Sequence, residues 1–241
     1  DSLGYSAIKG DPWVAHPKLD LFSGGVNRVA IEETIKKFEQ REGVSINTVY
    51  NGCGILVSQI HAGASPDAYF ACDISFMTAV EDRFSSPRTL SSTEMVILVQ
   101  KGDPKGIENL EGLGRGSGLK VGIANEQQSA LGALTVRLLE KQGLLDAVRA
   151  NVRVRTPTAD LLVNQMRTGA LDAAIVYRAN TSKVADDLDV IPIELPDARA
   201  YQPYAINKAS RFPHLAGRFR DALLADDSRD AFRDAGFTWL A

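Results

Sequence analysis

The sequence predicts an α/β protein in which mainly parallel sheets are flanked by helices. Strand-like and helix-like patterns alternate from Leu19 onward. The intervening helices run for about 9 to 15 residues, a length typical of the connections in βαβ units. Two strand-like runs, 94–102 and 172–177, are apolar enough to be buried on both faces, as in parallel sheets.

The first half of the chain contains four predicted strands, at 19–23, 44–50, 67–73 and 94–102. In the helix after the first strand, Ile31, Ile35 and Phe38 repeat at helical spacing, and Gly43 ends it. A second helix, 55–63, follows the stretch "NGCG" and is closed by Gly63.

The second half repeats the pattern. Strands are predicted at 118–125, 152–156, 172–177, 189–193 and 204–208. The helix predicted at 126–143 places Leu131, Leu134 and Leu138 on one stripe, and a further helix is predicted at 159–169. The tail, 214–237, has a helical pattern throughout, with a break near Asp226–Ser228.

The size and composition fit two lobes. A chain of 241 residues, 44% of them hydrophobic, can bury two cores. We expect an irregular arm at 1–17 with Trp13 as an anchor, one lobe from 18–95 plus 200–241, and a second from 96–199. The net charge of −3 does not indicate binding to nucleic acid or to an anionic membrane. No apolar run approaches the roughly 20 residues needed to span a bilayer.

Four strand-to-helix turns carry the candidate site: 23–27, 51–54, 125–130 and 156–160. Each precedes a helix and so offers unpaired N–H groups and the positive end of a helix dipole, which together bind anions without Lys or Arg. Glycines let an anion approach the backbone closely; these are Gly24, Gly25, Gly52 and Gly54. Such turns are also ordinary capping sites, but four of them in this architecture favour a binding cleft between the lobes, at the carboxyl ends of the strands.

Enzyme signatures are missing from the sequence. It contains no phosphate-loop pattern, no G-x-S-x-G and no H-E-x-x-H. The three histidines, His16, His61 and His214, are scattered, and none falls on a turn where it would activate Cys53. We therefore expect a binding protein, with a thiol-dependent enzyme or redox protein as the alternative from another class.

Several blocks of sequence resemble one family. These are "LDLFSGG", "QIHAGASPDAYFACD", "MVILVQKGD", "LKVGIAN", "GALDAAIVY" and "FRDAGFTW". They are similar to the periplasmic molybdate/tungstate-binding proteins of ABC importers, from about Leu19 to Trp239. The resemblance implies a type II periplasmic-binding-protein fold: two lobes, each with a mainly parallel sheet flanked by helices, crossed twice by the chain. It further implies that the cleft closes by a hinge on a small tetrahedral oxyanion, held by neutral donors.

The resemblance also implies the setting. We expect a secreted, mature, extracytoplasmic protein that binds a small inorganic ligand as its cargo, has no cofactor and contacts no nucleic acid. It would be a monomer that delivers the ligand to a membrane permease.

The family's donor positions carry over with changes. Its serine after the first strand falls on Val26, with Ser23 and Asn27 nearby, and its second serine falls on Cys53. The backbone donor after the third strand falls on Cys72. In the second lobe the matching positions are the turn residues Ser129 and Ala130, the backbone donor Ala159 and the hydroxyl of Tyr177.

Cys53 and Cys72 are the only cysteines, and the resemblance places them at neighbouring pocket positions. Three alternatives stay open. A disulfide fits an oxidising compartment. A pair of thiolates would bind a soft metal or metalloid, with Asp73 or Glu126 as a possible further ligand. Two inert pocket-lining thiols are the third.

Overall fold

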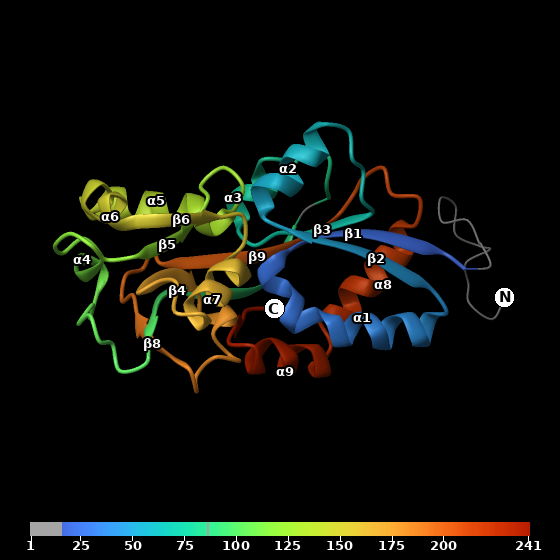
Figure 1. Ribbon diagram of the computed structural model, residues 1–241. Helices are drawn as coiled ribbons and strands as arrows, with labels where there is room; N and C mark the ends of the chain where they lie inside the picture. The colour runs from blue at the N-terminus through green and yellow to red at the C-terminus, as the bar shows by residue number, and fades with distance from the viewer. Residues whose placement is uncertain (1–15, 86) are drawn as a thin grey trace. The chain divides into compact units, whose positions relative to one another are not determined.

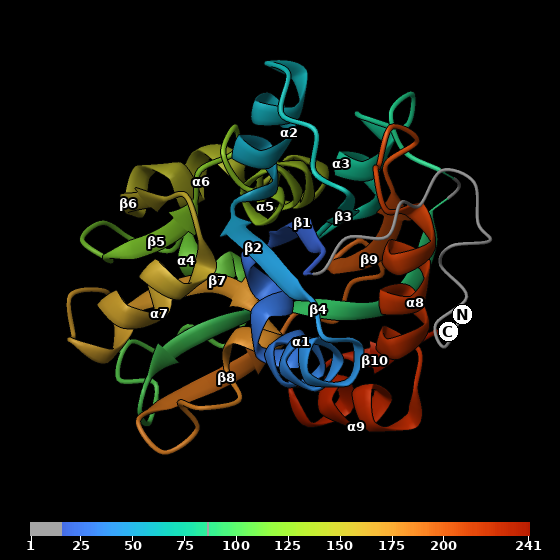
Figure 2. The ribbon, with the colours of Figure 1, turned by 90° about the vertical axis from the view of Figure 1, so that its right-hand side faces the viewer.

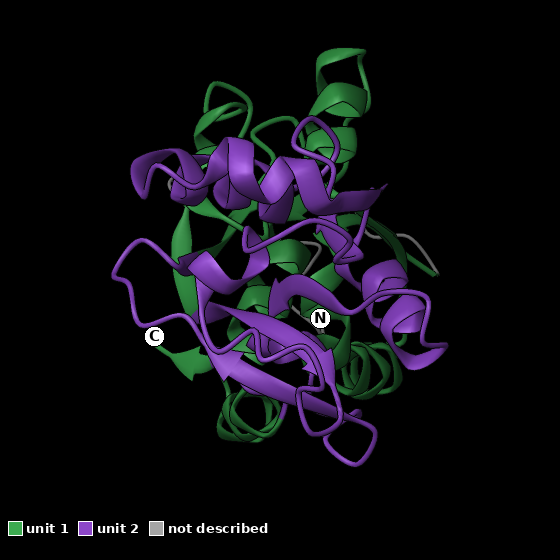
Figure 3. Ribbon diagram, turned by 60° about the vertical axis from the view of Figure 1, so that its left-hand side comes forward, with its two compact units in different colours: residues 1–91, 201–234, 238–241 green, residues 92–200, 235–237 purple. Residues whose placement is uncertain are grey.

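The computed structural model describes residues 16–85 and 87–241, so nearly all of the predicted arm lies outside the described residues. The described chain forms two compact units (Figure 3). Unit 1 comprises residues 16–91, 201–234 and 238–241, and unit 2 comprises 92–200 and 235–237. The chain passes from unit 1 to unit 2 within β4 (Arg88–Gln100), and returns within β9 (Arg199–Ile206).

The sheet of unit 1 has the strand order β2-β1-β3-β9. Its further strands are β1 (Lys18–Gly24), β2 (Ser45–Asn51), β3 (Ala68–Phe70) and the short β10 (Thr238–Trp239). β1 is parallel to both β2 and β3, whereas β9 runs antiparallel to β3. The first residues of the long β4 also belong here, where Leu240 N donates to Leu90 O at 2.9 Å.

Helices cover both faces of the unit 1 sheet (Figures 1 and 2). One group is α1 (Arg28–Glu42), α8 (Pro213–Leu223) and α9 (Asp226–Asp234), and the other is α2 (Cys53–His61) and α3 (Ile74–Thr78). A short 3-10 turn, η1 (Gly25–Asn27), runs directly from β1 into α1. β1 therefore leads through η1 into α1, and β2 ends at the first turn of α2, which positions the two candidate turns of unit 1.

Aromatic rings join the α1, α8 and α9 layer to the sheet. Phe38 of α1 meets Phe219 of α8 with ring centroids 5.2 Å apart, and Tyr204 of β9 meets Phe219 at 6.1 Å. Phe70 of β3 contacts Tyr204 at 6.1 Å, while its neighbour Tyr69 points to the opposite face and meets Phe84 at 5.8 Å. This alternation follows the period of two of a strand, so β3 contributes to the core on both sides.

The sheet of unit 2 has the order β4-β7-β5-β6, with β8 paired to the other edge of β4. Its strands are β5 (Val121–Ala124), β6 (Val152–Thr156), β7 (Ala173–Tyr177) and β8 (Leu188–Pro192). β5 is parallel to β6 and β7, whereas β4 is antiparallel to β7 and β8. The parallel part again ends at helix-opening turns.

The helices of unit 2 are α4 (Leu110–Leu113), α5 (Ala130–Lys141), α6 (Leu145–Asn151), α7 (Ala159–Arg167) and the 3-10 turn η2 (Arg178–Asn180). In Figure 1, α5 and α6 lie on one side of β5 and β6, and α7 lies on the other. The predicted stripe of Leu131, Leu134 and Leu138 is buried. Residues 95–99 of β4 and 173–177 of β7 are buried throughout, as their unbroken apolar runs predict.

The predicted α/β fold class is confirmed, and several element boundaries differ. β4 begins at Arg88 rather than 94, and α6 was not predicted. The tail breaks between α8 and α9 at residues 224–225, just before the predicted place, and α9 ends at Asp234. Within the residues described, none of the helices has the length and apolar character needed to cross a bilayer.

Candidate functional site

The turn after β1 forms the first part of the unit 1 site. Ser23 and Asn27 are completely buried, and Val26 is 6% exposed. The Ser23 hydroxyl donates to Gly24 O at 3.2 Å, and the Asn27 amide donates to Phe70 O at 3.2 Å. Both polar side chains therefore brace the turn from inside unit 1, and the side chain of Val26 offers no hydrogen-bond donor.

A disulfide joins Cys53, the first residue of α2, to Cys72, just after β3. The Cα atoms are 6.4 Å apart, within the range that disulfides span. The backbone N–H of Cys72 donates to Cys53 Sγ at 3.0 Å. Of the three alternatives for the cysteine pair, the structure has the disulfide, and the N–H that the family resemblance assigned to ligand is directed at sulfur.

Gly24 lies against this disulfide. A Cβ atom built on Gly24 would collide with Cys72 Sγ and come within 3.0 Å of Cys53 Sγ and 3.1 Å of Cys72 N. At the next residue, Gly25, a Cβ would meet only Asn51 O, at 3.9 Å. Gly24 is therefore needed for the close approach of β1 to the disulfide.

The N-terminus of α2 adjoins the same disulfide. Ile55 N and Leu56 N donate to Gly52 O at 3.0 and 3.1 Å, so the intrahelical bonds start two residues into the helix. No side chain among the described residues caps α2 at Gly52. The N–H groups of Cys53 and Gly54 therefore precede the helical bonding and lie at the positive end of the dipole.

In unit 2, the turn after β5 opens α5 at Ser129 and Ala130. Asn125 organises this turn, since its Oδ1 accepts from Gln127 N at 2.9 Å and its backbone O accepts from Ser129 N at 3.0 Å. Serine at an N-cap usually accepts a hydrogen bond from the first turn of its helix. The Ser129 hydroxyl makes no such bond within the described chain, which leaves the N-terminal donors of α5 uncapped.

The turn after β6 opens α7 at Ala159. Asn125 N donates to Thr156 O at 2.7 Å, which ties this turn to the one after β5. The Thr156 hydroxyl donates to Thr158 O at 2.7 Å, and the Thr158 side chain, considered against the described residues, does not cap α7. The two predicted turns of unit 2 are therefore neighbours.

Tyr177 ends β7 and is 2% exposed. Its backbone N donates to Asn180 Oδ1 at 3.3 Å, and Asn180 Nδ2 donates to Asp160 Oδ1 at 3.2 Å on the first turn of α7. This chain of contacts links the end of β7 to the N-terminus of α7. It also places one carboxylate, Asp160, beside the predicted donor Ala159.

Charged residues next to the candidate positions form ion pairs or cap a helix. Arg178 pairs with Glu94 at 2.9 Å, so its charge is partly offset. Glu126 lies 3.5 Å from Arg149, and Asp73 caps α3 by accepting from Ser75 N at 3.0 Å.

Two consequences follow for a metal site. In the described part of the chain, no group of three or more His, Cys, Asp or Glu side chains is arranged to hold a metal ion. A soft-metal site at the two cysteines would first require reduction, because thiolates are the metal ligands.

Sequence reasoning missed two positioning features. One is the bridge from Tyr177 through Asn180 to Asp160, which an Asn three residues after the strand end could have suggested. The other is Gly132, where a Cβ would collide with Asn125 O and lie 2.7 Å from Ala124 O. A glycine inside a helix pattern often marks such a close approach.

The fold and the turns are those expected of a solute-binding protein: α/β units whose parallel strands end at helix N-termini without side-chain caps. The chain belongs to the bacterial extracellular solute-binding protein family, whose model matches residues 19–238. Members of this family are transport components without enzymatic activity, and they bind the transported ligand without a cofactor.

Curated relatives agree with this assignment, and a solved structure shares the fold. The chain is 28% identical over 202 residues to the molybdate-binding protein ModA of Mycobacterium tuberculosis, covering 81% of this chain and 74% of the relative. It is 26% identical over 216 residues to the putative ABC transporter substrate-binding lipoprotein YvgL of Bacillus subtilis, covering 87% and 82%. The periplasmic molybdate-binding protein of Azotobacter vinelandii superposes with a TM-score of 0.75 at 19% identity, covering 92% of this chain and all of that one (100%).

Proposed function

We propose that this protein binds a small tetrahedral oxyanion of the molybdate or tungstate class outside the cytoplasm and delivers it to the membrane permease of an ABC importer. The observation that carries the proposal is that α2, α5 and α7 all begin without a side-chain cap from the described residues, while α1 continues from η1. Each starts at a turn that contains neither Lys nor Arg. Uncapped helix N-termini favour an anion held by neutral donors.

The donors differ between the two units. In unit 1 the family's hydroxyl positions are Val26 and Cys53, so the backbone N–H groups of Cys53 and Gly54 would serve instead. Ser23, Gly24, Gly25, Asn27, Gly52 and Cys72 would form the wall behind them. In unit 2 the donors would be the Ser129 hydroxyl, the Tyr177 hydroxyl and the N–H groups of Ala130 and Ala159.

The relatives support this ligand class. ModA of Mycobacterium tuberculosis binds molybdate by its name and aligns with most of the chain. The disulfide supports it from the structure, because two bonded sulfurs provide no thiolate for a soft metal while leaving the N-terminus of α2 in place.

The test is a thermal-shift series on oxidised and on reduced protein, with molybdate, tungstate, sulfate, phosphate, zinc, copper(I) and arsenite. A ligand at 100 times its Kd stabilises the folded state by about 2.7 kcal/mol, a shift that is readily detected. We expect an oxyanion to stabilise the oxidised protein. Stabilisation only by a soft metal, and only after reduction, would overturn the proposal.

A further inference from the structure

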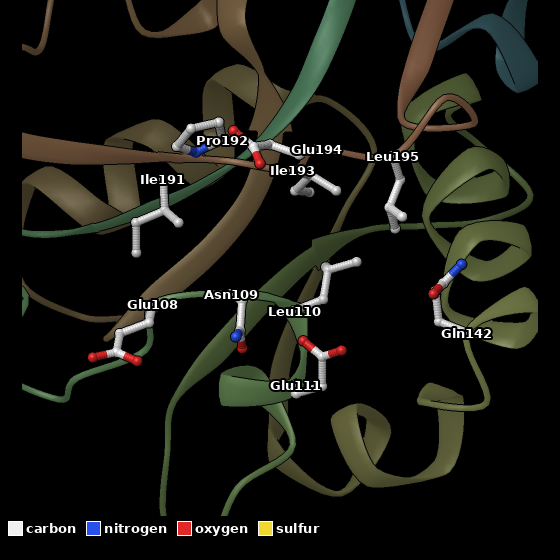
Figure 4. A pocket seen from close by; sticks show the side chains of 10 residues that line it. All are labelled: Glu108, Asn109, Leu110, Glu111, Gln142, Ile191, Pro192, Ile193, Glu194 and Leu195. Atoms are coloured by element: carbon white, nitrogen blue, oxygen red, sulfur yellow. The ribbon is translucent and has the colours of Figure 1, made fainter.

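Unit 2 has a groove that none of the four candidate turns lines. It has a volume of about 400 Å³ and lies between the segment 108–111 and the segment 191–195 (Figure 4). In Figure 4 the side chain of Ile191 points from β8 across the groove toward the segment that carries Asn109. A volume of this size suits a small molecule.

The groove shares no lining residue with the candidate oxyanion donors of unit 2. β4 runs antiparallel to β7, and Val99 near the end of β4 pairs with Ala173, the first residue of β7. The chain that follows β4 therefore starts at the opposite end of the strands from Tyr177. Val96 pairs with Val176 on one side and with Pro192 on the other, so the second wall lies level with the end of β7 and is separated from it by β4. Gln142, which lines the groove, follows the last residue of α5, and the 12 residues of that helix separate it by about 18 Å from Ser129.

One wall of the groove is fixed by hydrogen bonds. Asp103 Oδ2 accepts from Ile107 N at 2.7 Å, and Asn109 Oδ1 accepts from Gly112 N at 3.0 Å, which caps α4. Gly112 packs so closely that a Cβ there would collide with the carbonyl group of Ile107. The wall is therefore preformed, as ligand pockets usually are.

The lining combines apolar surface with negative charge. Its apolar side chains include Leu110, Ile191 and Ile193, and its charged side chains are three glutamates: Glu108, Glu111 and Glu194. All three glutamates are exposed, and within residues 16–85 and 87–241 none of their carboxylates makes an ion pair or a hydrogen bond. The nearby Lys141 is paired with Asp197 instead.

These features specify the charge and shape of an occupant. Nothing in the lining is cationic, so the three carboxylates complement a positive charge. The apolar wall adds contact area for an alkyl chain.

We propose that this groove is a second binding site, independent of the oxyanion site, for a small organic cation with an apolar chain. Its charged end, a protonated amine or a guanidinium, lies among Glu108, Glu111 and Glu194, and its chain packs on Ile191 and Ile193. Exposed carboxylates are screened by water and salt, so binding is weak, on the order of millimolar, and weakens as salt is added.

The experiment is an NMR titration of the whole chain at pH 7 with three probes at matched ionic strength. Hexylamine carries both the charge and the alkyl chain, hexan-1-ol carries only the chain, and ammonium chloride carries only the charge. We expect hexylamine to shift the amide signals of 108–111 and 191–195 saturably, and the other two probes to bind there at least tenfold more weakly. Equal shifts with hexan-1-ol, or no saturation with hexylamine, would overturn the proposal.

Two double variants provide a second test of the groove. Glu111→Gln with Glu194→Gln should weaken hexylamine binding about tenfold without changing the fold, because both side chains are exposed. Glu33→Gln with Glu81→Gln removes the same charge from exposed positions of unit 1 and should leave binding unchanged. Equal affinity in the two double variants would contradict the role of the groove. Molybdate binding, followed in the same samples, should be unaffected by either pair, so failure of this proposal is separate from failure of the oxyanion proposal.

Discussion

At the residue scale, Tyr177 is the side chain whose proposed role is easiest to isolate. Replacing it with Phe removes only the hydroxyl from a ring that is 2% exposed. A hydrogen bond to a charged partner contributes about 1.5–3 kcal/mol. We therefore expect Tyr177→Phe to weaken oxyanion binding at least tenfold by calorimetry. Tyr201→Phe, at a tyrosine that is 42% exposed, is the matched control and should bind as the parent does; equal affinity in both variants would remove Tyr177 from the site.

Gly24 gives a second residue-scale prediction, on stability. Alanine there must displace the sulfur of Cys72 or the strand itself, and overpacking of this kind costs about 1–3 kcal/mol. Gly25→Ala, whose Cβ would lie 3.9 Å from Asn51 O, should change stability far less. Urea denaturation of both variants measures the difference.

The cause of the Gly24 effect can be tested by coupling. If the disulfide is the obstacle, Gly24→Ala should cost much less in a Cys53→Ala/Cys72→Ala background, since residues in contact are not additive. An equal cost in both backgrounds would mean that the backbone of Cys72, 3.1 Å from the added Cβ, is the obstacle instead.

At the element scale, two helical glycines predict opposite results from the same substitution. Glycine inside a helix is usually about 1 kcal/mol less favourable than alanine. Gly217 of α8 has only Ile206 Cδ1 near its added Cβ, at 3.9 Å, so Gly217→Ala should raise the melting temperature. Gly132 of α5 packs against the backbone of Asn125 and Ala124, so Gly132→Ala should lower it. Two melting temperatures that moved in the same direction would contradict this interpretation of the start of α5.

The N-terminus of α7 predicts a charge effect that distinguishes ligand classes. Asp160 lies on the first turn of α7, and its carboxylate accepts a hydrogen bond from Asn180. Asp160→Asn keeps an oxygen acceptor and removes the negative charge. A charge near a helix end is worth about 0.3–1 kcal/mol, so oxyanion affinity should rise about two- to fivefold. A cationic ligand would instead bind more weakly to the variant, which a direct titration separates.

The elements also show what the sequence could and could not predict. The apolar runs of β4 and β7 and the leucine stripe of α5 predicted buried elements, because hydrophobic periodicity reflects burial directly. The start of β4 was missed because residues 88–93 are mostly polar, although Ser91, Ser92 and Thr93 are all buried. Their burial depends on partners distant in sequence, such as Gln202, whose Oε1 accepts from Ser91 Oγ at 2.9 Å.

The candidate site, too, could be predicted only in part. Local composition identified the four turns, because Gly, Ser and Asn have turn and capping preferences of their own. The direction of each donor could not be predicted. The Cys72 N–H donates to the sulfur of Cys53, a contact that forms only when α2 and β3 are packed together, and the Ser23 hydroxyl donates to the carbonyl of its neighbour Gly24.

At the scale of the whole molecule, the disulfide belongs to one unit only. It closes a sequence separation of 19 residues within unit 1, between α2 and β3. Constraining the unfolded chain over a loop of this length stabilises the folded state by about 3 kcal/mol. Unit 2 contains no cysteine and gains nothing directly from this constraint.

Removing the disulfide should therefore loosen the protein unevenly. In the Cys53→Ala/Cys72→Ala variant we expect amide hydrogen exchange to accelerate in α2 and β3, while β5 and β7 of unit 2 keep their protection. Native proteins open in separate cooperative blocks of differing stability, and the dense burial of β7 places it among the most stable parts of unit 2. Faster exchange of similar size in both units would instead show that the units open together, and the stability provided by the disulfide would then be a property of the whole chain.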